Sequence, residues 1–279
     1  GPYDADSQLA VVRRTAAQLA RILKTGQRLA IVHGNGPQVG RIVLQNETAR
    51  HITPAMPFDV CGAMSQGLIG YHIQQALGQR MQALGIPGAP VTLVSQVLVD
   101  GSDPAFDHPT KPIGPFYTRE QAEAIMAEKG YVFREDSGRG WRRVVASPLP
   151  LQIVELAQVK ALLAAGFVPI AAGGGGIPVV RRDDGLAGVA AVIDKDLAAW
   201  RLAEGLQAGT LLILTEVEQA FLHYGKPQQK ALGEVSAADM RAWLGEGHFA
   251  AGSMGPKVEA ALRFVEGGAG RVAVITSLE

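Results

Sequence analysis

The chain has 279 residues and carries 26 basic and 26 acidic side chains. This length suits one large α/β domain or two closely packed lobes. The balanced charge creates no global field that would recruit nucleic acid or an anionic membrane, so we expect neither partner and look to local lysines for anion binding. The single cysteine, Cys61, excludes an intramolecular disulfide and suits the reducing environment of the cytoplasm.

Helices and apolar strands alternate along most of the chain. Apolar residues between Leu9 and Leu23 recur at helical spacing, which predicts a helix that stops near Gly26. The segment "RLAIVH" (28–33) follows as a strand and runs into the turn "HGNGPQVG" and a second helix. Later in the chain the predicted helices are 150–165, 196–207 and 256–266, and the strands that follow them are 167–172, "GTLLILTEV" (209–217) and "RVAVIT" (271–276). This alternation predicts an α/β fold with an open, mainly parallel central sheet and helices on both faces.

Two regions depart from the alternation. The stretch from Ala161 to Val180 is uncharged, but glycines and prolines interrupt it, so we expect a helix end, a buried strand and a tight turn instead of a membrane span. The N-terminus has no basic segment leading into an apolar one, so no signal peptide is expected. Residues from about 100 to 145 are rich in Pro, Gly, Asp and aromatic residues. We predict that they form a lobe inserted into a single domain spanning 1–279.

Glycine turns follow two of the predicted strands, in "HGNGPQVG" and "AAGGGGIP". Glycine lets backbone N–H groups approach an anion closely, and a helix N-terminus adds a favourable dipole. The first turn has the spacing G-x-G-x-x-x-G and neither turn is followed by G-K-[ST], so neither the dinucleotide fingerprint nor the P-loop is matched. Tight turns needed only for packing remain the alternative interpretation.

Three lysines lie in turns bounded by glycine or proline. Lys111 lies in "TKPIGPFYT", and Lys195 stands between two aspartates at a predicted helix start, where capping acids with a solvated ion pair are the alternative. Lys257 lies in the first turn of another predicted helix, where it opposes the helix dipole unless an anion is shared with the free N–H groups. Three such charges converging on one anion would suit phosphoryl transfer, which needs a polyphosphate to be positioned and neutralised.

Competing motifs are weaker. "AMSQG" around Ser65 has Ala63 in place of the first glycine of the G-x-S-x-G nucleophile motif and lies within a predicted helix, so a hydrolase is not favoured. The histidines show no H-x-x-x-H spacing or pairing with cysteine, so we assign no residue to a metal site. His33 is interpreted as a packing histidine.

Six segments together resemble the carbamate kinases, members of the amino acid kinase fold family. They are "HGNGPQVG", "DPAFDHPTKPIGPFYT", "GRGWRRVVASPLP", "GGGGIPVV", "VIDKDLAAWRLAE" and "GSMGPKVEAA". The resemblance implies a three-layer sandwich with a protruding subdomain. It also implies magnesium-dependent, reversible transfer of a phosphoryl group from ATP to carbamate, often run towards ATP during arginine breakdown, by a homodimer.

The resemblance assigns roles to individual residues. Asn35 and Gly36 would hold carbamate or the transferring phosphoryl group, and Lys111 would be delivered to that group by a stiff loop of the lobe. Lys195 and Lys257 would clamp the ATP or ADP phosphates. Asp196 would orient these lysines. The cleft would be bordered by Gly173, Gly174 and Gly175, and the nucleotide would be contacted by Gly255 and Tyr224. The acceptor side would lie in the N-terminal part and the nucleotide side in about 150–279.

The family's opening strand, with a glycine-glycine-asparagine turn that contacts phosphate, and its last stretch after "ITSLE" have no counterpart here. We therefore expect fewer phosphate ligands, an exposed sheet edge and reduced activity. Two other functions fit the same motifs. One is a kinase for another small carboxylate or phosphonate acceptor, and the other is a nucleotide-binding regulatory module without turnover.

Overall fold

The structure, a computed structural model, describes residues 4–136, 138–250 and 252–277. It divides into two compact units, Gly1–Lys195 and Asp196–Glu279. The first unit extends beyond residue 150 because strands at 168–170 and 177–182 pair with strands at 90–92 and 96–98. The assignment of about 150–279 to a nucleotide side stays a prediction. The ends of the predicted domain, 1–3 and 278–279, lie outside the described residues.

The first unit alternates helices and strands and also contains the inserted lobe. Its helices are α1 Ala5–Lys24, α2 Gly36–Ala49, α3 Phe58–Ala83, α4 Arg119–Lys129 and α5 Leu156–Ala164, with short 3-10 helices η1 Pro104–Phe106 and η2 Gly173–Gly175. Its strands are β1 Pro90–Thr92, β2 Gln96–Leu98, β3 Lys111–Tyr117, β4 Val132–Glu135, β5 Trp141–Val145, β6 Gln152–Ile153, β7 Val168–Ile170, β8 Ile177–Arg182 and β9 Gly185–Gly188.

The second unit begins within the first turn of helix α6 Lys195–Gly205 and contains the rest of that helix. Its strands are β10 Thr210–Thr215, β11 Phe221–Leu222, β12 Lys230–Ala231 and β13 Val272–Ser277, and its helices after α6 are α7 Ala237–Gly245 and α8 Met254–Glu266. The predicted helices 196–207 and 256–266 and the predicted strands 209–217 and 271–276 are therefore present, with slightly different ends.

Strands that alternate with helices pair in parallel, as the predicted α/β fold requires. These pairs are β1 with β7, β2 with β8, and β10 with β13. They belong to separate sheets, and β2 lies inside a four-stranded sheet of order β6-β2-β8-β9. Antiparallel pairs occur in that sheet, in the lobe and in the β11–β12 pair.

Two predicted elements differ from the structure. The predicted strand 28–33 is reduced to a single parallel bridge between Ile31 and Ile170, since the ladder does not continue beyond it. The predicted helix 150–165 begins only at Leu156, because Gln152 and Ile153 pair with β2 as the short strand β6. Helical spacing of apolar residues did not reveal this strand pairing.

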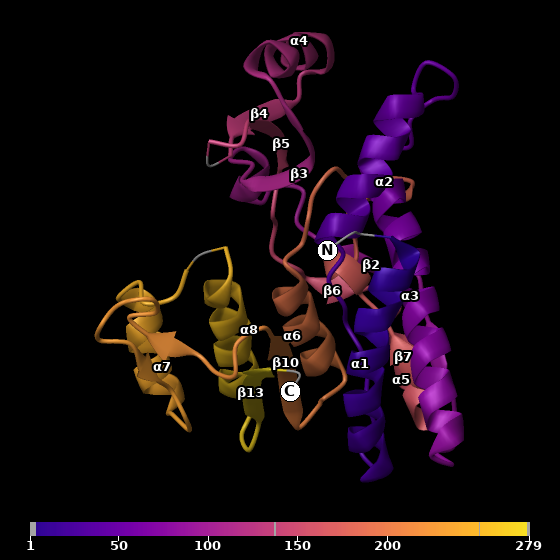
Figure 1. Cartoon of the computed structure of the whole chain (residues 1–279), viewed down its shortest axis with the longest axis vertical. Helices are drawn as coiled ribbons and strands as arrows, with labels where there is room; N and C mark the ends of the chain where they lie inside the picture. The colour runs from indigo at the N-terminus through magenta and orange to yellow at the C-terminus, as the bar shows by residue number, and fades with distance from the viewer. Residues whose placement is uncertain (1–3, 137, 251, 278–279) are drawn as a thin grey trace. The chain divides into compact units, whose positions relative to one another are not determined.

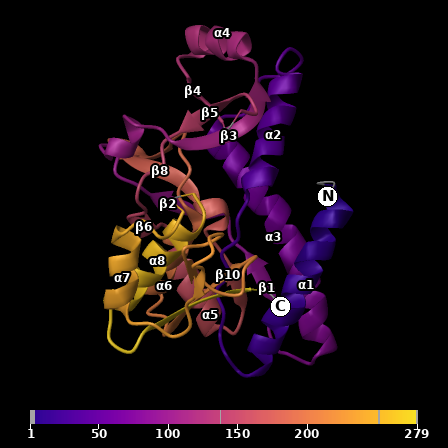
Figure 2. The same cartoon turned by 60° about the vertical axis from the view of Figure 1, so that its left-hand side comes forward.

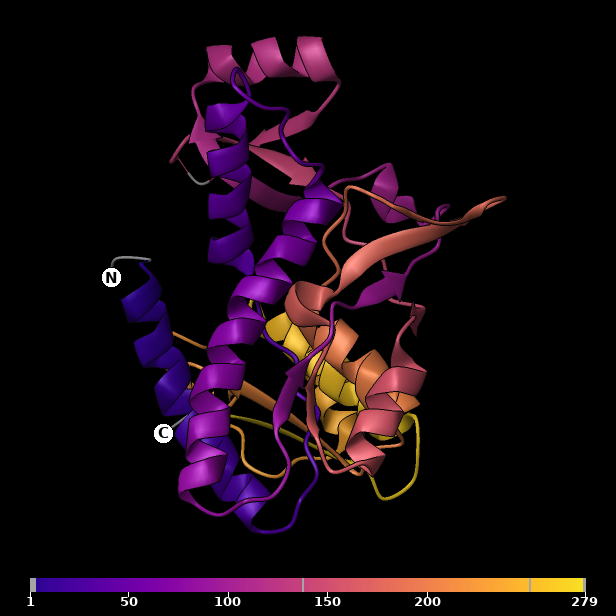
Figure 3. The same cartoon turned by 90° about the vertical axis from the view of Figure 1, so that its right-hand side faces the viewer.

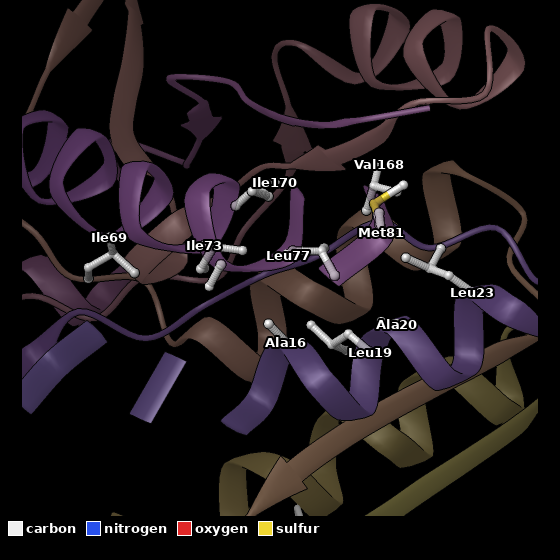
Figure 4. Close-up of a cluster of buried hydrophobic side chains, with 11 residues drawn as sticks. Ala16, Leu19, Ala20, Leu23, Ile69, Ile73, Leu77, Met81, Val168 and Ile170 are labelled. Carbon is white, nitrogen blue, oxygen red and sulfur yellow. The ribbon is translucent and has the colours of Figure 1, made fainter. Parts of the chain in front are cut away.

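The core of the first unit lies where α1 and α3 pack on β7 (Figure 4). Figure 1 shows α1 and α3 side by side over much of their length. The buried residues of this cluster are Ala16, Leu19, Ala20, Leu23, Ile69, Ile73, Ala76, Leu77, Met81, Val168 and Ile170. Burial of each valine, leucine, isoleucine or methionine side chain contributes about 1.5 to 3 kcal/mol, so this core anchors α3 against the sheet.

The inserted lobe is a three-stranded antiparallel sheet of order β3-β5-β4 with α4 packed on it. Figures 2 and 3 show these elements beside one end of α2. The Nζ of Lys129 in α4 lies 3.4 Å from Oε2 of Glu47 in α2, which ties the lobe to this helix. Lys111 is the first residue of β3, so the prediction that a loop carries it is wrong. Pro112 is tolerated there because β3 is an edge strand.

No helix in the described part of the chain combines the length and hydropathy that a bilayer crossing requires. The uncharged stretch from Ala161 to Val180 instead contains the end of α5, then β7, η2 and the start of β8.

The second unit has its own core, in which α6 and α8 pack on β10 and β13. Phe264 and Ala260 of α8 are fully buried there.

Candidate active site

The four consecutive glycines form a turn into which other segments of the first unit pack closely. Gly174, Gly175 and Gly176 all have positive φ, between 69° and 98°, which glycine adopts at little cost. A Cβ on Gly173 would overlap the ring of His33, and one on Gly174 would overlap the amide of Asn35. A Cβ on Gly175 would overlap the carbonyl of Ile193. The turn therefore needs glycine for close contact as well as for its backbone angles.

Three of the N–H groups of this turn, those of Gly174, Gly175 and Gly176, are already hydrogen-bonded. Gly174 donates to the carbonyl of His33 at 2.7 Å, Gly175 to Ala172 and Gly176 to Gly173. Any contribution of Gly174 and Gly175 to a ligand would therefore come from close approach of the backbone and not from N–H donation. The structure thus limits the expectation that this turn cradles an anion through its amides.

The N-terminus of α2 has the features of an anion site. Asn35 occupies the N-cap position, but its side chain does not cap the helix and donates instead to Ser65 Oγ at 2.8 Å. The first turn of α2 contains no acidic residue, and Pro37 supplies no N–H. The dipole and the N–H groups of the first turn, which begins at Gly36, therefore favour a negatively charged group at this end of the helix.

Lys111 and Lys195 both reach this region of the first unit. Lys111 donates from Nζ to Asp194 Oδ2 at 3.0 Å, and Asp194 directly precedes Lys195 in the chain. The aliphatic part of Lys195 lies against Gly34, since a Cβ on that glycine would stand 3.1 Å from Cδ of the lysine. The structure thus places Lys195 against the turn that contains Asn35 and Gly36, and it joins Lys111 to the residue that precedes Lys195.

The third lysine lies in the second unit with its own carboxylate. Lys257 donates to Asp196 Oδ2 at 2.9 Å, and the two side chains are only 12% and 9% exposed. This buried pair excludes the alternative of a solvated ion pair for Asp196, and it shows that a protein carboxylate compensates the charge of Lys257 in the first turns of α8. Gly255 is buried and donates its N–H to Ala250, whereas Tyr224 is 64% exposed and its ring lies near that of Phe221.

Comparison with known proteins shows the family to which this chain belongs. The sequence model of the amino acid kinase family matches residues 4–276. Carbamate kinase of Clostridium perfringens is 50% identical over 98% of this chain and 88% of its own length, and carbamate kinase of Pyrococcus furiosus is 51% identical over 96% of this chain and 86% of its own. The chain belongs to the carbamate kinases of the amino acid kinase family.

A solved structure of this family has the same fold. Carbamate kinase from Giardia lamblia bound to AMP-PNP superposes with a TM-score of 0.95 at 46% identity, covering 100% of this chain and 88% of that one. The family resemblance and the kinase class inferred from the motifs are therefore confirmed, and so is the α/β fold.

Three residues that contact the candidate site residues were missed or left without a role by the sequence analysis. They are Asp194, Ser65 and Gln66. The aspartate beside Lys195 was visible as a motif, but its partner Lys111 is distant in sequence. Ser65 and Gln66 lie four and three residues before Ile69 on the buried face of α3, so two polar residues on an apolar stripe were the available signal.

Burial changes the titration of two further side chains. Desolvation lowers the pKa of His33 below its ordinary value of 6.5, although a contact with the Gly34 carbonyl opposes this. Desolvation also raises the pKa of the Cys61 thiol, with Asp59 adding to the effect, so the thiol stays protonated and is a poor nucleophile. Within the described residues, no three His, Cys, Asp or Glu side chains form a group able to hold a metal ion.

We predict that Gly174→Ala destabilises the kinase more than Gly166→Ala. Both glycines have positive φ, but a Cβ on Gly166 meets open space. Gly166→Ala should cost about 1 kcal/mol for its backbone angle, and Gly174→Ala should cost at least about 1 kcal/mol more because it displaces Asn35. Urea unfolding of both variants measures the difference, and equal losses would contradict the close packing of Asn35 on the turn.

We predict that His33 makes stability depend on pH. His33 binds a proton near pH 6.5 in the unfolded chain but only at a lower pH in the folded chain. The contribution of neutral His33 to the free energy of unfolding is therefore present above pH 6.5 and is lost as the pH falls. The unfolding free energy measured at about pH 7.5 and about pH 5.5 should therefore fall less in His33→Gln than in the parent. His51→Gln, at an exposed histidine, is the control. If the unfolding free energy of His33→Gln falls with pH as much as that of the parent, the prediction is wrong.

Proposed function

We propose that this chain catalyses reversible phosphoryl transfer between ATP and carbamate, forming ADP and carbamoyl phosphate. The observation that carries the proposal is the grouping of Lys111, Lys195 and Asn35 in the first unit, which links a pair of cations to a helix N-terminus. About 50% identity to carbamate kinases over nearly the whole chain supports carbamate as the acceptor.

The reaction requires charge neutralisation more than proton transfer. An oxygen of ionised carbamate attacks the γ-phosphorus, a new P–O bond forms, and the bond to the β–γ bridging oxygen breaks as ADP leaves. The attacking oxygen carries no proton, so no general base is needed. Catalysis then rests on positioning the two anions and on stabilising charge over the phosphoryl oxygens.

Each site residue has a part in this proposal. Asn35 and Gly36 hold the acceptor or the transferring group at the N-terminus of α2, and Lys111 neutralises charge on that group. Lys195 and Lys257 bind nucleotide phosphates, with Asp196 orienting Lys257 through their ion pair. The further proposed contacts are Gly173, Gly174 and Gly175 along the acceptor turn, and Gly255 and Tyr224 with the nucleotide.

Magnesium fits these residues as a companion of the nucleotide. Mg²⁺ is usually bound by substrate phosphates, water and one or two carboxylates, and the described residues offer no cluster of three ligands. We assign it no protein ligand, and when bound it would supply charge neutralisation to the phosphates. The direction towards ATP, a place in arginine breakdown and a cytoplasmic location complete the proposal.

The activity is tested by ATP formation from ADP, magnesium and carbamoyl phosphate, with acetyl phosphate as the comparison donor. We expect ATP to form with carbamoyl phosphate as the donor and not with acetyl phosphate. Preference for acetyl phosphate or a phosphorylated phosphonate as the donor would support a kinase with another acceptor. Binding of ADP with no turnover of any donor would support a nucleotide-binding module instead.

We predict that the two lysines Lys111 and Lys257 affect different kinetic constants. Lys111→Ala should lower kcat about a hundredfold with little change in ADP affinity, because it acts on the transferring group. Lys257→Ala should weaken ADP binding about tenfold or more. Calorimetric ADP titration and steady-state kinetics separate the two effects.

The control for Lys111→Ala is Arg119→Ala, since Arg119 is another cation of the lobe that pairs with a carboxylate, Glu123, at an exposed position. This variant should keep the parental kcat. Equal loss of ADP affinity in Lys111→Ala and Lys257→Ala would contradict the proposed division of roles. Unfolding of Lys257→Ala is followed in parallel, because it leaves Asp196 buried without this partner.

We also propose that the chain forms a homodimer through α3. This helix is apolar on both faces, since Ile69, Ile73 and Leu77 are buried in the core while the opposite stripe is exposed. The exposed stripe consists of Val60, Met64, Leu68 and Tyr71. A helix that is apolar all round is normally covered on every side, and a second copy would cover this stripe.

Met64→Glu is predicted to shift the chain from dimer to monomer, because a charge would be buried against the partner copy. Sedimentation velocity measures the shift. Ile52→Glu is the control, as Ile52 is 79% exposed and lies outside α3. A monomeric parent, or equal behaviour of the two variants, would contradict the proposed interface.

A further inference from the structure

Two adjacent polar residues of α3, Ser65 and Gln66, are buried in the first unit with exposures of 0% and 1%. They lie on the same face of the helix as Ile69 and Ile73, which the core holds in place. A polar side chain at such a site costs free energy unless it is hydrogen-bonded. Both side chains have such bonds, and their partners lie in the segments that form the proposed acceptor site.

Gln66 links the helix to the four-glycine turn. Its Oε1 accepts from the N–H of Ser95 at 2.8 Å. Its Nε2 donates to the carbonyl of Ser95 at 3.1 Å and to the carbonyl of Gly173 at 3.1 Å. The carboxamide therefore uses both of its donor hydrogens and its acceptor oxygen, so its orientation is determined by its partners. The Gly173 carbonyl is held in place by a helix instead of by the turn alone.

Ser65 links the same helix to Asn35. Its hydroxyl donates to the carbonyl of Gly62 at 2.6 Å, which uses its one hydrogen. Oγ therefore offers only lone pairs to Asn35, and it accepts from Nδ2 of that residue at 2.8 Å. This bond determines which end of the Asn35 amide faces α3. The amide also lies against Gly174, where any Cβ would overlap it.

The two glycine turns are therefore set by neighbouring residues of one helix. Asn35 belongs to the first turn and Gly173 to the second, and the two turns meet where Asn35 contacts Gly174 and where Gly174 donates to the His33 carbonyl. A shift of the Ser65–Gln66 segment would move both turns together. Misplacement of reacting groups by about 1 Å can cost about a hundredfold in rate.

We propose that Ser65 and Gln66 are positioning residues for phosphoryl transfer, Ser65 by orienting the Asn35 carboxamide and Gln66 by holding the Gly173–Gly176 turn. The role rests on the proposed function, in which Asn35 holds the acceptor or the transferring group. Neither residue needs to touch a substrate to perform it. A positioning role predicts a lower kcat with unchanged ADP affinity. A general loss of folding would instead lower the stability and reduce kcat and ADP affinity together.

The kinetic test compares Ser65→Ala and Gln66→Met with Gln74→Met. Gln74 lies on the same helix and its Oε1 accepts from the N–H of Thr92 at 3.0 Å, so its replacement also removes a bond to a backbone amide. We expect kcat to fall about ten- to a hundredfold in the first two variants with the KM for ADP unchanged. Gln74→Met should keep the parental kcat.

A second readout does not depend on turnover. The Gly174 amide should exchange its hydrogen about tenfold faster or more in Gln66→Met than in Gln74→Met, because the turn loses its tie to α3. The side-chain N–H resonances of Asn35 should shift in Ser65→Ala, since their acceptor is removed. Both are measured by NMR on the folded protein.

The outcomes separate the two proposals. If the parent forms no ATP from any donor, the proposed function fails, and the NMR comparison still decides whether Ser65 and Gln66 position the turns. If Gly174 exchange, the Asn35 resonances and kcat change no more than in Gln74→Met, the positioning role is wrong. An equal fall of kcat and ADP affinity in Ser65→Ala and Gln66→Met would overturn it as well.

Discussion

The proposed acceptor site depends on the close approach of backbone segments at the Gly173–Gly176 turn. Three of its residues have positive φ, and a Cβ at any of the four positions would overlap a neighbour. The neighbours include His33 and Asn35 on one side and the Ile193 carbonyl on another. Because the four glycines have no side chains, the turn that contains Asn35 and the segment that leads to Lys195 both pack directly on the backbone of residues 173–176. The spacing of these groups, on which positioning of a phosphoryl group depends, follows from this constraint.

Two of the lysines that the sequence singled out are each held by a carboxylate within their own unit. Lys111 bonds to Asp194, and Lys257 bonds to Asp196. Breaking a nearly buried pair such as Lys257 and Asp196 is costly, although such a pair adds little net stability compared with apolar packing. In the proposed function, this pair keeps the ammonium group of Lys257 oriented at low dielectric, where its attraction for phosphate is stronger than in water. The two aspartates flank Lys195, so one short segment carries or orients all three cations.

Core packing determines where these groups lie. The apolar stripe of α3 fixes this helix against α1 and β7, and the same stripe continues into the hydrogen-bonded residues Ser65 and Gln66. The lobe is tied to α2 through Lys129 and Glu47, while α2 begins at the turn that contains Asn35. In the proposed function, the elements that stabilise the core therefore also determine the positions of the site residues, and the buried side chains of Ser65 and Gln66 connect the two.

The sequence alone determined the order of helices and strands, the glycine turns, the inserted lobe and the three lysines, because each depends on local spacing and on residue types with distinct backbone preferences. It misplaced the start of α5, overextended the strand around Ile31 and put Lys111 on a loop, since strand pairing joins residues far apart in the chain. Only the tertiary structure revealed that Lys111 meets Asp194 and that Ser65 meets Asn35. A hydrogen bond or ion pair across 30 or 83 residues leaves no periodic trace in sequence, because its geometry is set by the packing of the whole core.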